Sequence, residues 1–151
     1  MQLIPIKERL EENKEFLTNP LCLEILKMTV DFYKIVGFVP PWIGYFAEKD
    51  GELVGSAGFK GKPVNGTIEI AYGTFEKNRN KGIGTDICRK LVELSLKTDP
   101  SLRITARTLP ENNFSSRILE KNNFFLAGTV FDQEDGYVWE WEFKHNISSD
   151  C

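Results

Sequence analysis

The chain has 151 residues, of which 41% are hydrophobic and 27% are charged, a balance typical of one soluble globular domain. Its net charge of −3 argues against the broad basic surface that nucleic-acid binding requires. Three widely spaced cysteines and a single histidine argue against a disulfide framework and against a zinc site. The charged N-terminal segment and the lack of an apolar run of about 18 residues predict a cytoplasmic protein without a membrane span.

Residues 1–40 are predicted to be helical. A short charged helix is expected over residues 7–17, and a longer helix follows, with Asn19 as its N-cap and Pro20 at its first position. The longer helix is expected to end at Gly37. Its apolar residues recur at helical spacing and predict one core-facing stripe, made of Leu21, Ile25, Met28, Phe32 and Ile35.

The pattern changes to strands after Trp42. Residues 42–59 predict two strands joined by a turn at 50–51, because Asp-Gly between apolar runs is a hairpin signal. A third strand over 65–75 follows a turn at Asn65-Gly66. Residues 83–97 predict an amphipathic helix, and residues 102–108 a short strand.

The last predicted elements are a helix over 110–121, capped by Asn112 or Asn113, and a closing hairpin over 124–143. The hairpin is expected to turn at Asp135-Gly136, with its alternating aromatic residues on one face. Residues 1–144 therefore predict a single domain of the α/β or α+β class, and residues 145–151 a disordered tail.

The segment Arg-Asn-Lys-Gly-Ile-Gly, residues 79–84, lies between a predicted strand and a predicted helix. The first N–H groups of a helix have no internal partner, and the helix dipole adds partial positive charge there. Gly82 and Gly84 would let an anion approach the backbone, and Arg79 and Lys81 would add charge. A phosphate site and a plain glycine-bearing turn are both compatible with these six residues.

The surroundings of this segment favour the phosphate site. The pattern R-x-x-G-x-G between a strand and an amphipathic helix resembles the pyrophosphate loop of the GNAT acyltransferase superfamily. The segments 40–61, 68–75 and 111–124 resemble its RimJ/RimL-type branch in order and spacing, over residues 40–143. The resemblance implies a GNAT-like mixed, mostly antiparallel central sheet of about six to seven strands flanked by helices. It also implies an N-acetyltransferase that uses acetyl-CoA and no metal.

The resemblance assigns residues to the binding of coenzyme A. The strand before the loop would splay from its neighbour and bind the pantetheine arm through free backbone groups, and a β-bulge at Gly73 would break its pairing; the alternative is a normal paired strand. Asn112 would bind the pantetheine from the start of the next helix, or act only as an N-cap. The full set implied for the cofactor is Tyr72, Gly73, Thr74, Phe75, Arg79, Asn80, Lys81, Gly82, Ile83, Gly84, Thr85, Asn112 and Ser115.

Two catalytic residues are implied. Glu69 alternates with the apolar residues of its strand and matches a family glutamate that binds the amine or accepts its proton; the alternative is a solvent-exposed glutamate. A role for Glu69 in binding or catalysis is favoured if helices cover both faces of that strand, because such strands rarely contain a glutamate. Ser115 would assist the departing thiolate, or lie on the helix surface. Many family members place a tyrosine acid where this chain has Leu119, and Asn123 stands where a turn glycine is usual.

The acceptor is expected to be a primary amine, either a small molecule or a protein N-terminus. Phe32, Tyr33 and Trp42 would line its pocket together with Glu69, or would belong to the core. No membrane or nucleic-acid partner is expected, and the protein would be a monomer or a homodimer. Two other hypotheses remain: a non-catalytic acyl-CoA-binding module, and an interaction protein whose glycine loop is only a turn.

Overall fold

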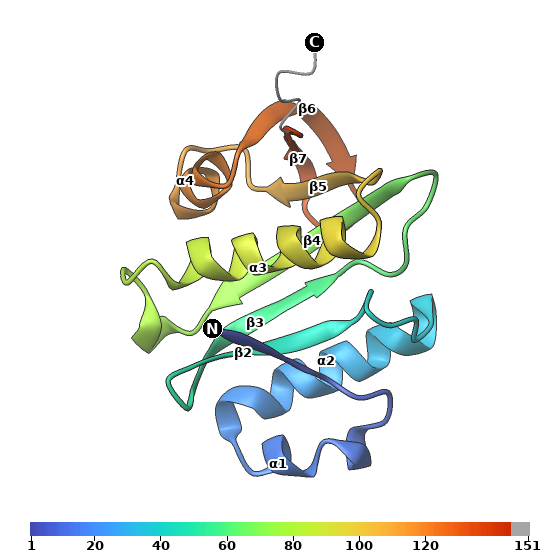
Figure 1. Ribbon diagram of the computed structural model, residues 1–151, viewed down its shortest axis with the longest axis vertical. Helices are drawn as coiled ribbons and strands as arrows, with labels where there is room; N and C mark the ends of the chain where they lie inside the picture. Colours follow the sequence, from blue (N-terminus) through green and yellow to red (C-terminus); the bar gives the residue numbers. More distant parts are fainter. Residues whose placement is uncertain (146–151) are drawn as a thin grey trace.

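The computed structural model describes residues 1–145 and contains one seven-stranded sheet in the order β1-β2-β3-β4-β5-β7-β6 (Figure 1). Neighbouring strands are antiparallel, except that β4 and β5 are parallel. The strands are β1 (Gln2–Pro5), β2 (Gly44–Lys49), β3 (Glu52–Phe59), β4 (Thr67–Thr74), β5 (Arg103–Thr108), β6 (Phe124–Asp132) and β7 (Gly136–Phe143). The α-helices are α1 (Lys14–Leu17), α2 (Pro20–Val36), α3 (Ile83–Thr98) and α4 (Phe114–Lys121). This mixed, mostly antiparallel sheet confirms the predicted fold class.

The N-terminal segment differs from its prediction. Residues 2–5 form an edge strand paired with β2, rather than part of a helix. Residues 7–17 form a 3₁₀ turn, Leu10–Glu12, and the single-turn helix α1. Asn13 separates them: its buried amide donates to the carbonyls of Lys7 and Arg9 and accepts from the N–H of Lys7. Such local hydrogen bonds from a side chain to the backbone compete with helix formation. The spacing of hydrophobic residues along the sequence does not reveal them.

Helix α2 has the predicted ends but buries a different face. Asn19 accepts a hydrogen bond from the N–H of Leu21, as a cap should. The buried residues are Cys22, Leu26, Val30 and Tyr33. Met28 and Ile35, from the stripe predicted to face the core, are 69% and 81% exposed. The prediction was wrong because two apolar stripes exist on this helix, and the helical period alone does not choose between them.

The sheet decides which stripe of α2 is buried. A Cβ atom at Gly44 of β2 would lie 2.7 Å from the Thr29 side chain, so only glycine lets this helix lie so close to the strand. The Tyr33 hydroxyl donates to the carbonyl of Ile6 and accepts from the N–H of Gly44, each at 2.8 Å. Phe46 points to the same side, where its ring contacts Phe16.

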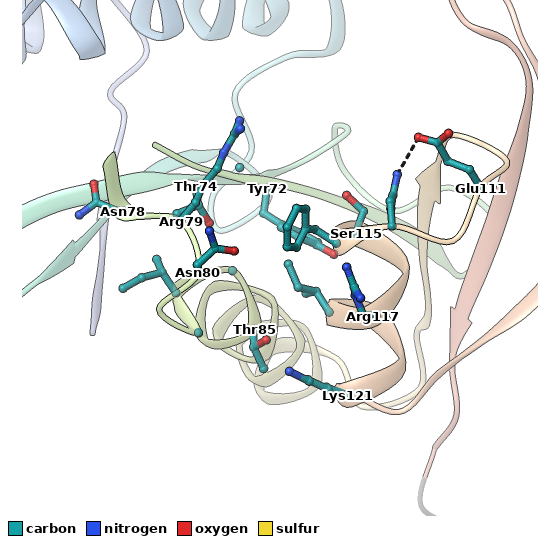
Figure 2. Close-up of a pocket in the computed structure, with 17 residues that line it drawn as sticks. Tyr72, Thr74, Asn78, Arg79, Asn80, Thr85, Glu111, Ser115, Arg117 and Lys121 are labelled. Carbon is teal, nitrogen blue, oxygen red and sulfur yellow. Dashed lines mark hydrogen bonds between the residues drawn. The ribbon is translucent and has the colours of Figure 1, made fainter. Parts of the chain in front are cut away.

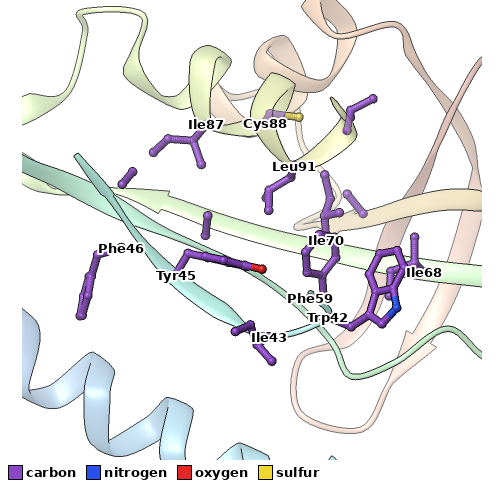
Figure 3. Packing of buried hydrophobic residues seen from close by; sticks show 14 of the residues in the cluster. Trp42, Ile43, Tyr45, Phe46, Phe59, Ile68, Ile70, Ile87, Cys88 and Leu91 are labelled. Carbon is purple, nitrogen blue, oxygen red and sulfur yellow. The ribbon is translucent and has the colours of Figure 1, made fainter. Parts of the chain in front are cut away.

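Helix α3 covers the opposite side of the sheet. Ile87, Cys88 and Leu91 lie over the strands in Figure 3, whereas Phe46 points away toward α2. Below we call the side under α3, which carries Ile68 and Ile70, the α3 face. The side that carries Phe46 is the α2 face. The two faces matter because residues that are close in sequence on one strand can serve two separate compartments.

The predicted turns are confirmed. Asp50 and Gly51 join β2 to β3 with φ values of 53° and 79°, and Gly136 has a φ of 75° at the β6–β7 turn. Asn123 adopts a φ of 70°, so it replaces the usual turn glycine without loss of the turn. Asn113, not Asn112, is the N-cap of α4, and its side chain accepts from the N–H of Ser116.

The parallel strands β4 and β5 separate before either ends. Their pairing stops at Ile70 and Ala106, while β4 stays paired with β3 as far as Thr74. The predicted bulge at Gly73 is wrong, because the β3–β4 register is continuous there. The backbone of residues 71–74 is instead left without a β5 partner by the divergence of the two strands.

The predicted tail, 145–151, lies outside the described residues apart from His145. The imidazole Nε2 of His145 is 2.9 Å from the carbonyl oxygen of Leu102, so this residue belongs to the fold. Among the helices of residues 1–145, none is long and apolar enough to cross a membrane.

Replacing Tyr33 with phenylalanine tests the bridge between α2 and the strands. Tyr33→Phe should lower the free energy of unfolding by about 1–3 kcal/mol, because the buried N–H of Gly44 loses its acceptor. Tyr137→Phe is the matched control: this side chain is 69% exposed, and its loss of a hydroxyl should cost no more than about 0.5 kcal/mol. Chemical denaturation measures both. Equal stability of the two variants would contradict the assigned bridge.

Candidate active site

A cleft of about 840 Å³ opens where β4 ends on the α3 face (Figure 2). The end of β4, the loop that follows it, the start of α3 and one side of α4 form its walls. The lining residues are Tyr72, Gly73, Thr74, Asn78, Arg79, Asn80, Gly82, Ile83, Gly84, Thr85, Glu111, Asn113, Phe114, Ser115, Arg117, Ile118 and Lys121. The cleft therefore reaches the stretch of β4 that has no β5 partner.

The two glycines of the loop serve different purposes. Gly82 is the N-cap of α3 with a φ of 76°, and a Cβ added there would meet nothing within 4 Å. The free N–H groups of the helix start thus face open space, as an anion site requires. A Cβ at Gly84 would lie 2.6 Å from the Ile118 side chain. Gly84 thus lies against Ile118 where α3 meets α4, whereas the sequence had suggested that it gave a phosphate room.

Cationic side chains surround the start of α3. Arg79 comes from the loop, and Arg117 and Lys121 come from α4, one turn apart. Figure 2 shows Lys121 extending toward Thr85 at the first turn of α3. The guanidinium of Arg117 also lies 5.1 Å from the centre of the Phe114 ring. These charges and the helix N-terminus favour a ligand that carries phosphate groups.

Most residues predicted for the cofactor line the cleft, but three do not. Phe75, Lys81 and Asn112 are absent from its walls. The N–H of Phe75 is bonded to Val54 O on β3, and Asn112 is exposed beside the capping Asn113. Lining residues that the sequence analysis missed are Asn78, Glu111, Asn113, Phe114, Arg117, Ile118 and Lys121. Four of these share one side of α4 at helical spacing, a signal that points to the cleft only once α4 is placed beside α3.

The buried hydroxyl and thiol near the cleft keep their protons. Burial raises the pKa of Tyr72 well above its usual value and raises the pKa of Cys88 to about 12. A thiol in that state is no nucleophile, and Cys88 is a fully buried residue of the core. Ser115 is half-buried at the cleft, and Leu119, one turn further along α4, is fully buried in the core.

Glu69 lies on the α2 face, opposite the cleft. Its neighbours Ile68 and Ile70 are buried on the α3 face, as the alternation predicted. The expectation of helix cover on both faces fails at this strand: α3 packs against β4, but α2 makes no comparable contact with its other face, where the Glu69 side chain is 23% exposed. Partial burial raises the pKa of Glu69, and the positive charges of Arg107 and Lys60 oppose that rise.

A network of charged side chains continues from Glu69 across the α2 face. Arg107 of β5 donates to Asp132 Oδ2 of β6 at 3.2 Å, and its Nε lies 3.7 Å from Glu69 Oε1. Further along, Arg103 Nε donates to Glu142 Oε1 at 2.7 Å. On β4 itself, only the small residues Ala71 and Gly73 follow Glu69 on this face. The gap that opens between β4 and β5 is therefore not filled by large side chains of β4.

The residues predicted for an acceptor pocket separate into two groups. Tyr33 and Trp42 are 6% and 8% exposed, and the Trp42 ring packs edge-on against Phe59 in the core. Phe32 is half-buried, with Lys60 Nζ 6.0 Å from the centre of its ring. Since Lys60 also acts on Glu69, Phe32 is the one of the three that lies near the charged network.

The comparisons with known proteins identify the family. The model of the acetyltransferase (GNAT) domain matches residues 7–124, which is most of the chain. The chain therefore belongs to the GNAT acetyltransferase domain family.

One sequence relative is the uncharacterized N-acetyltransferase YjdG of Bacillus subtilis (strain 168), 40% identical over 87 residues. That match covers 56% of this chain and 51% of YjdG, about half of the relative's length. Aminoglycoside acetyltransferase AAC(6')-Ib, solved with paromomycin and acetyl-CoA, has a TM-score of 0.66 at 23% identity, over 99% of this chain and 97% of that one. RimL, a ribosomal-protein alpha-N-acetyltransferase solved with coenzyme A, has a TM-score of 0.66 at 17% identity, over 93% and 91%. At these identities the two structures establish the fold.

Proposed function

We propose that the protein is an N-acetyltransferase that moves an acetyl group from acetyl-CoA to a primary amine, by direct transfer in a ternary complex. One observation carries the proposal. The divergence of β4 from β5 after Ile70 leaves backbone groups free beside the cleft, and Glu69 stands on the other face of the same strand. A donor in the cleft and an amine at Glu69 could thus meet at this opening.

The cleft suits coenzyme A at both of its ends. The start of α3 with Arg79, Arg117 and Lys121 suits the pyrophosphate, and Tyr72, Gly73 and Thr74 offer backbone groups to the pantetheine amides. Ligands with two phosphates and an extended amide arm match this combination of a helix start and a free strand edge. Among residues 1–145, no group of three or more His, Cys, Asp or Glu side chains is arranged to hold a metal ion.

In the proposed reaction Glu69 accepts a proton from the ammonium form of the acceptor, directly or through one water. The neutral amine then attacks the thioester carbonyl carbon, and free N–H groups of β4 stabilise the oxyanion. The C–S bond breaks, and the thiolate of coenzyme A leaves with a hydrogen bond from the Ser115 hydroxyl. The second proton of the attacking nitrogen passes to the sulfur, directly or through water, so that the products are the amide and the free thiol. The reaction requires no covalent enzyme intermediate. Much of its rate would come from the alignment of the two bound substrates.

The acceptor is proposed to be a primary amine of a small molecule or of a protein N-terminus. AAC(6')-Ib is crystallised with aminoglycosides, and RimL is described as a protein alpha-N-acetyltransferase, so the shared fold is compatible with both classes. We place the chain nearer the RimJ/RimL branch, because the segments 40–61, 68–75 and 111–124 resemble it in order and spacing and Ser115 matches a serine of that branch. Phe32 and Glu69 would contact the acceptor.

Acetyl-CoA should stabilise the fold through the start of α3. At a hundredfold excess over its dissociation constant, the gain in free energy of unfolding should be about 2.7 kcal/mol. Gly82→Val should abolish the gain, because a branched side chain would fill the open space at the N-cap. Thermal melting with and without acetyl-CoA gives the measurement.

The control for that experiment must carry the same backbone strain. Gly66 also has a positive φ, 71°, and open space around its Cβ position, but it lies in a turn away from the cleft. Gly66→Val should lose intrinsic stability as Gly82→Val does, yet keep the full acetyl-CoA shift. An unchanged melting temperature of the wild type at millimolar acetyl-CoA would rule out the proposed donor.

The roles of Glu69 and Ser115 predict different pH dependences. Glu69→Gln should keep coenzyme A affinity and lose turnover by about 10²- to 10⁴-fold, most at low pH, where the amine is protonated. Raising the pH should partly restore activity, since more amine is then neutral in solution. Ser115→Ala should lower turnover modestly at every pH, because only a hydrogen bond to the leaving group is lost. The readout is a pH–rate profile on an amine found by screening for thiol release.

Glu142→Gln is the matched control for Glu69→Gln. Glu142 is a half-buried carboxylate on the same face, already hydrogen-bonded to Arg103. Its replacement should leave turnover nearly unchanged. Full activity of Glu69→Gln would make Glu69 a structural residue, and coenzyme A binding without turnover on a broad amine panel would favour a non-catalytic acyl-CoA-binding module.

A further inference from the structure

Arg107 supplies the positive charge that Glu69 contacts. Glu69 pairs with Thr105 across the parallel strands, so Arg107 lies two residues further along β5, on the same face. Its Nε is 3.7 Å from Glu69 Oε1, too far for a good hydrogen bond but close enough for a charge interaction. Arg107 also lies beyond Ala106, the last β5 residue paired with β4, and therefore at the opening.

Other carboxylates hold the guanidinium in place. Asp132 accepts its hydrogen bond at 3.2 Å, and Glu140 Oε1 lies 3.9 Å from its Nε. Asp132 is itself fixed by the N–H groups of Glu134 and Asp135 in the β6–β7 turn. The position of Arg107 is thus set by β6 and β7. The Arg107 guanidinium therefore acts on the Glu69 carboxylate through its positive charge, and neither Glu69 oxygen accepts a short hydrogen bond from it.

We propose that Arg107 is a positioning residue for acetyl transfer, which keeps the Glu69 carboxylate ionised beside the opening between β4 and β5 without touching either substrate. This inference rests on the function proposed above. It assigns the β6–β7 hairpin a part in the reaction, since Asp132 accepts a hydrogen bond from the guanidinium that acts on Glu69 and the carboxylate of Glu140 lies near it.

The charges around Glu69 are nearly balanced, so the loss of one cation matters. Burial, Glu140 and Asp132 favour the protonated form and raise the pKa of Glu69, whereas Arg107 and Lys60 favour the ionised form and lower it. These groups come from β5, β6, β7 and the residue that follows β3. Without Arg107, only Lys60 opposes burial and two carboxylates, and Glu69 would hold a proton over more of the working pH range.

Three variants test the inference. Arg107→Gln should raise the titration midpoint of the Glu69 side chain by about one pH unit, the low end of the effect expected from a neighbouring cation. Glu140→Gln should move the midpoint the opposite way, because it removes a negative charge and a competing partner of Arg107. Arg107→Lys should retain most of the wild-type midpoint. Carbon-13 NMR of the Glu69 carboxyl measures the midpoints, and the acid limb of kcat/KM should shift in the same direction.

Opposite shifts in two variants cannot come from a general loosening of the fold. In a Glu69→Gln background, Arg107→Gln should change the residual turnover by no more than about twofold, because the residue acts through Glu69. An unchanged Glu69 midpoint in Arg107→Gln, or a full loss of turnover repeated in the Glu69→Gln background, would overturn the inference. A wild type that binds acetyl-CoA but acetylates no amine would overturn the proposed function, and the role of Arg107 in transfer with it.

Discussion

The candidate site depends on the early end of the pairing between β4 and β5. Each strand keeps its other neighbour, because β4 continues beside β3 to Thr74 and β5 continues beside β7 to Thr108, so only the backbone groups that point into the opening lose their partners. The sheet therefore opens without losing its outer ladders. A wider separation of the two strands would break the sheet, and a separation later along the strands would close the opening. In both cases the cleft and Glu69 would no longer share one strand segment.

The opening separates two electrostatic environments within a few residues of chain. On the α3 face, the start of α3 and the side chains of Arg79, Arg117 and Lys121 favour anions. On the α2 face, two arginines are shared among four carboxylates, so carboxylates outnumber guanidinium groups. A polyanionic donor and a cationic acceptor would each be attracted to its own side. The chain's overall charge of −3 reveals neither compartment.

Much of the fold could be predicted from sequence because its signals are local. The hairpin turn of Asp50 and Gly51, the cap of α2 and the loop at Gly82 each depend on neighbouring residues alone, and all are found where expected. The failures depend on partners distant in sequence. The buried stripe of α2 is chosen by Gly44, and β1 exists because β2 offers an edge.

The same distinction applies to the site. The loop residues other than Lys81 line the cleft, and so does Ser115. The loop could be found because its pattern is contiguous in sequence. Arg117 and Lys121 were missed because their role depends on the packing of α4 beside α3, made close by Gly84. Tyr33 and Trp42 were proposed for the acceptor, but they occupy core positions that aromatic residues fill equally well. Aromatic side chains near a site do not distinguish packing from recognition in sequence.

The two halves of the site would respond differently to evolutionary change. In the proposed arrangement, the donor is bound largely by backbone groups of β4 and the start of α3, which most substitutions leave in place. The α2 face is built from side chains such as Phe32, Glu69 and Asp132, each of which one mutation can replace. New acceptors could therefore be acquired without rebuilding the donor cleft.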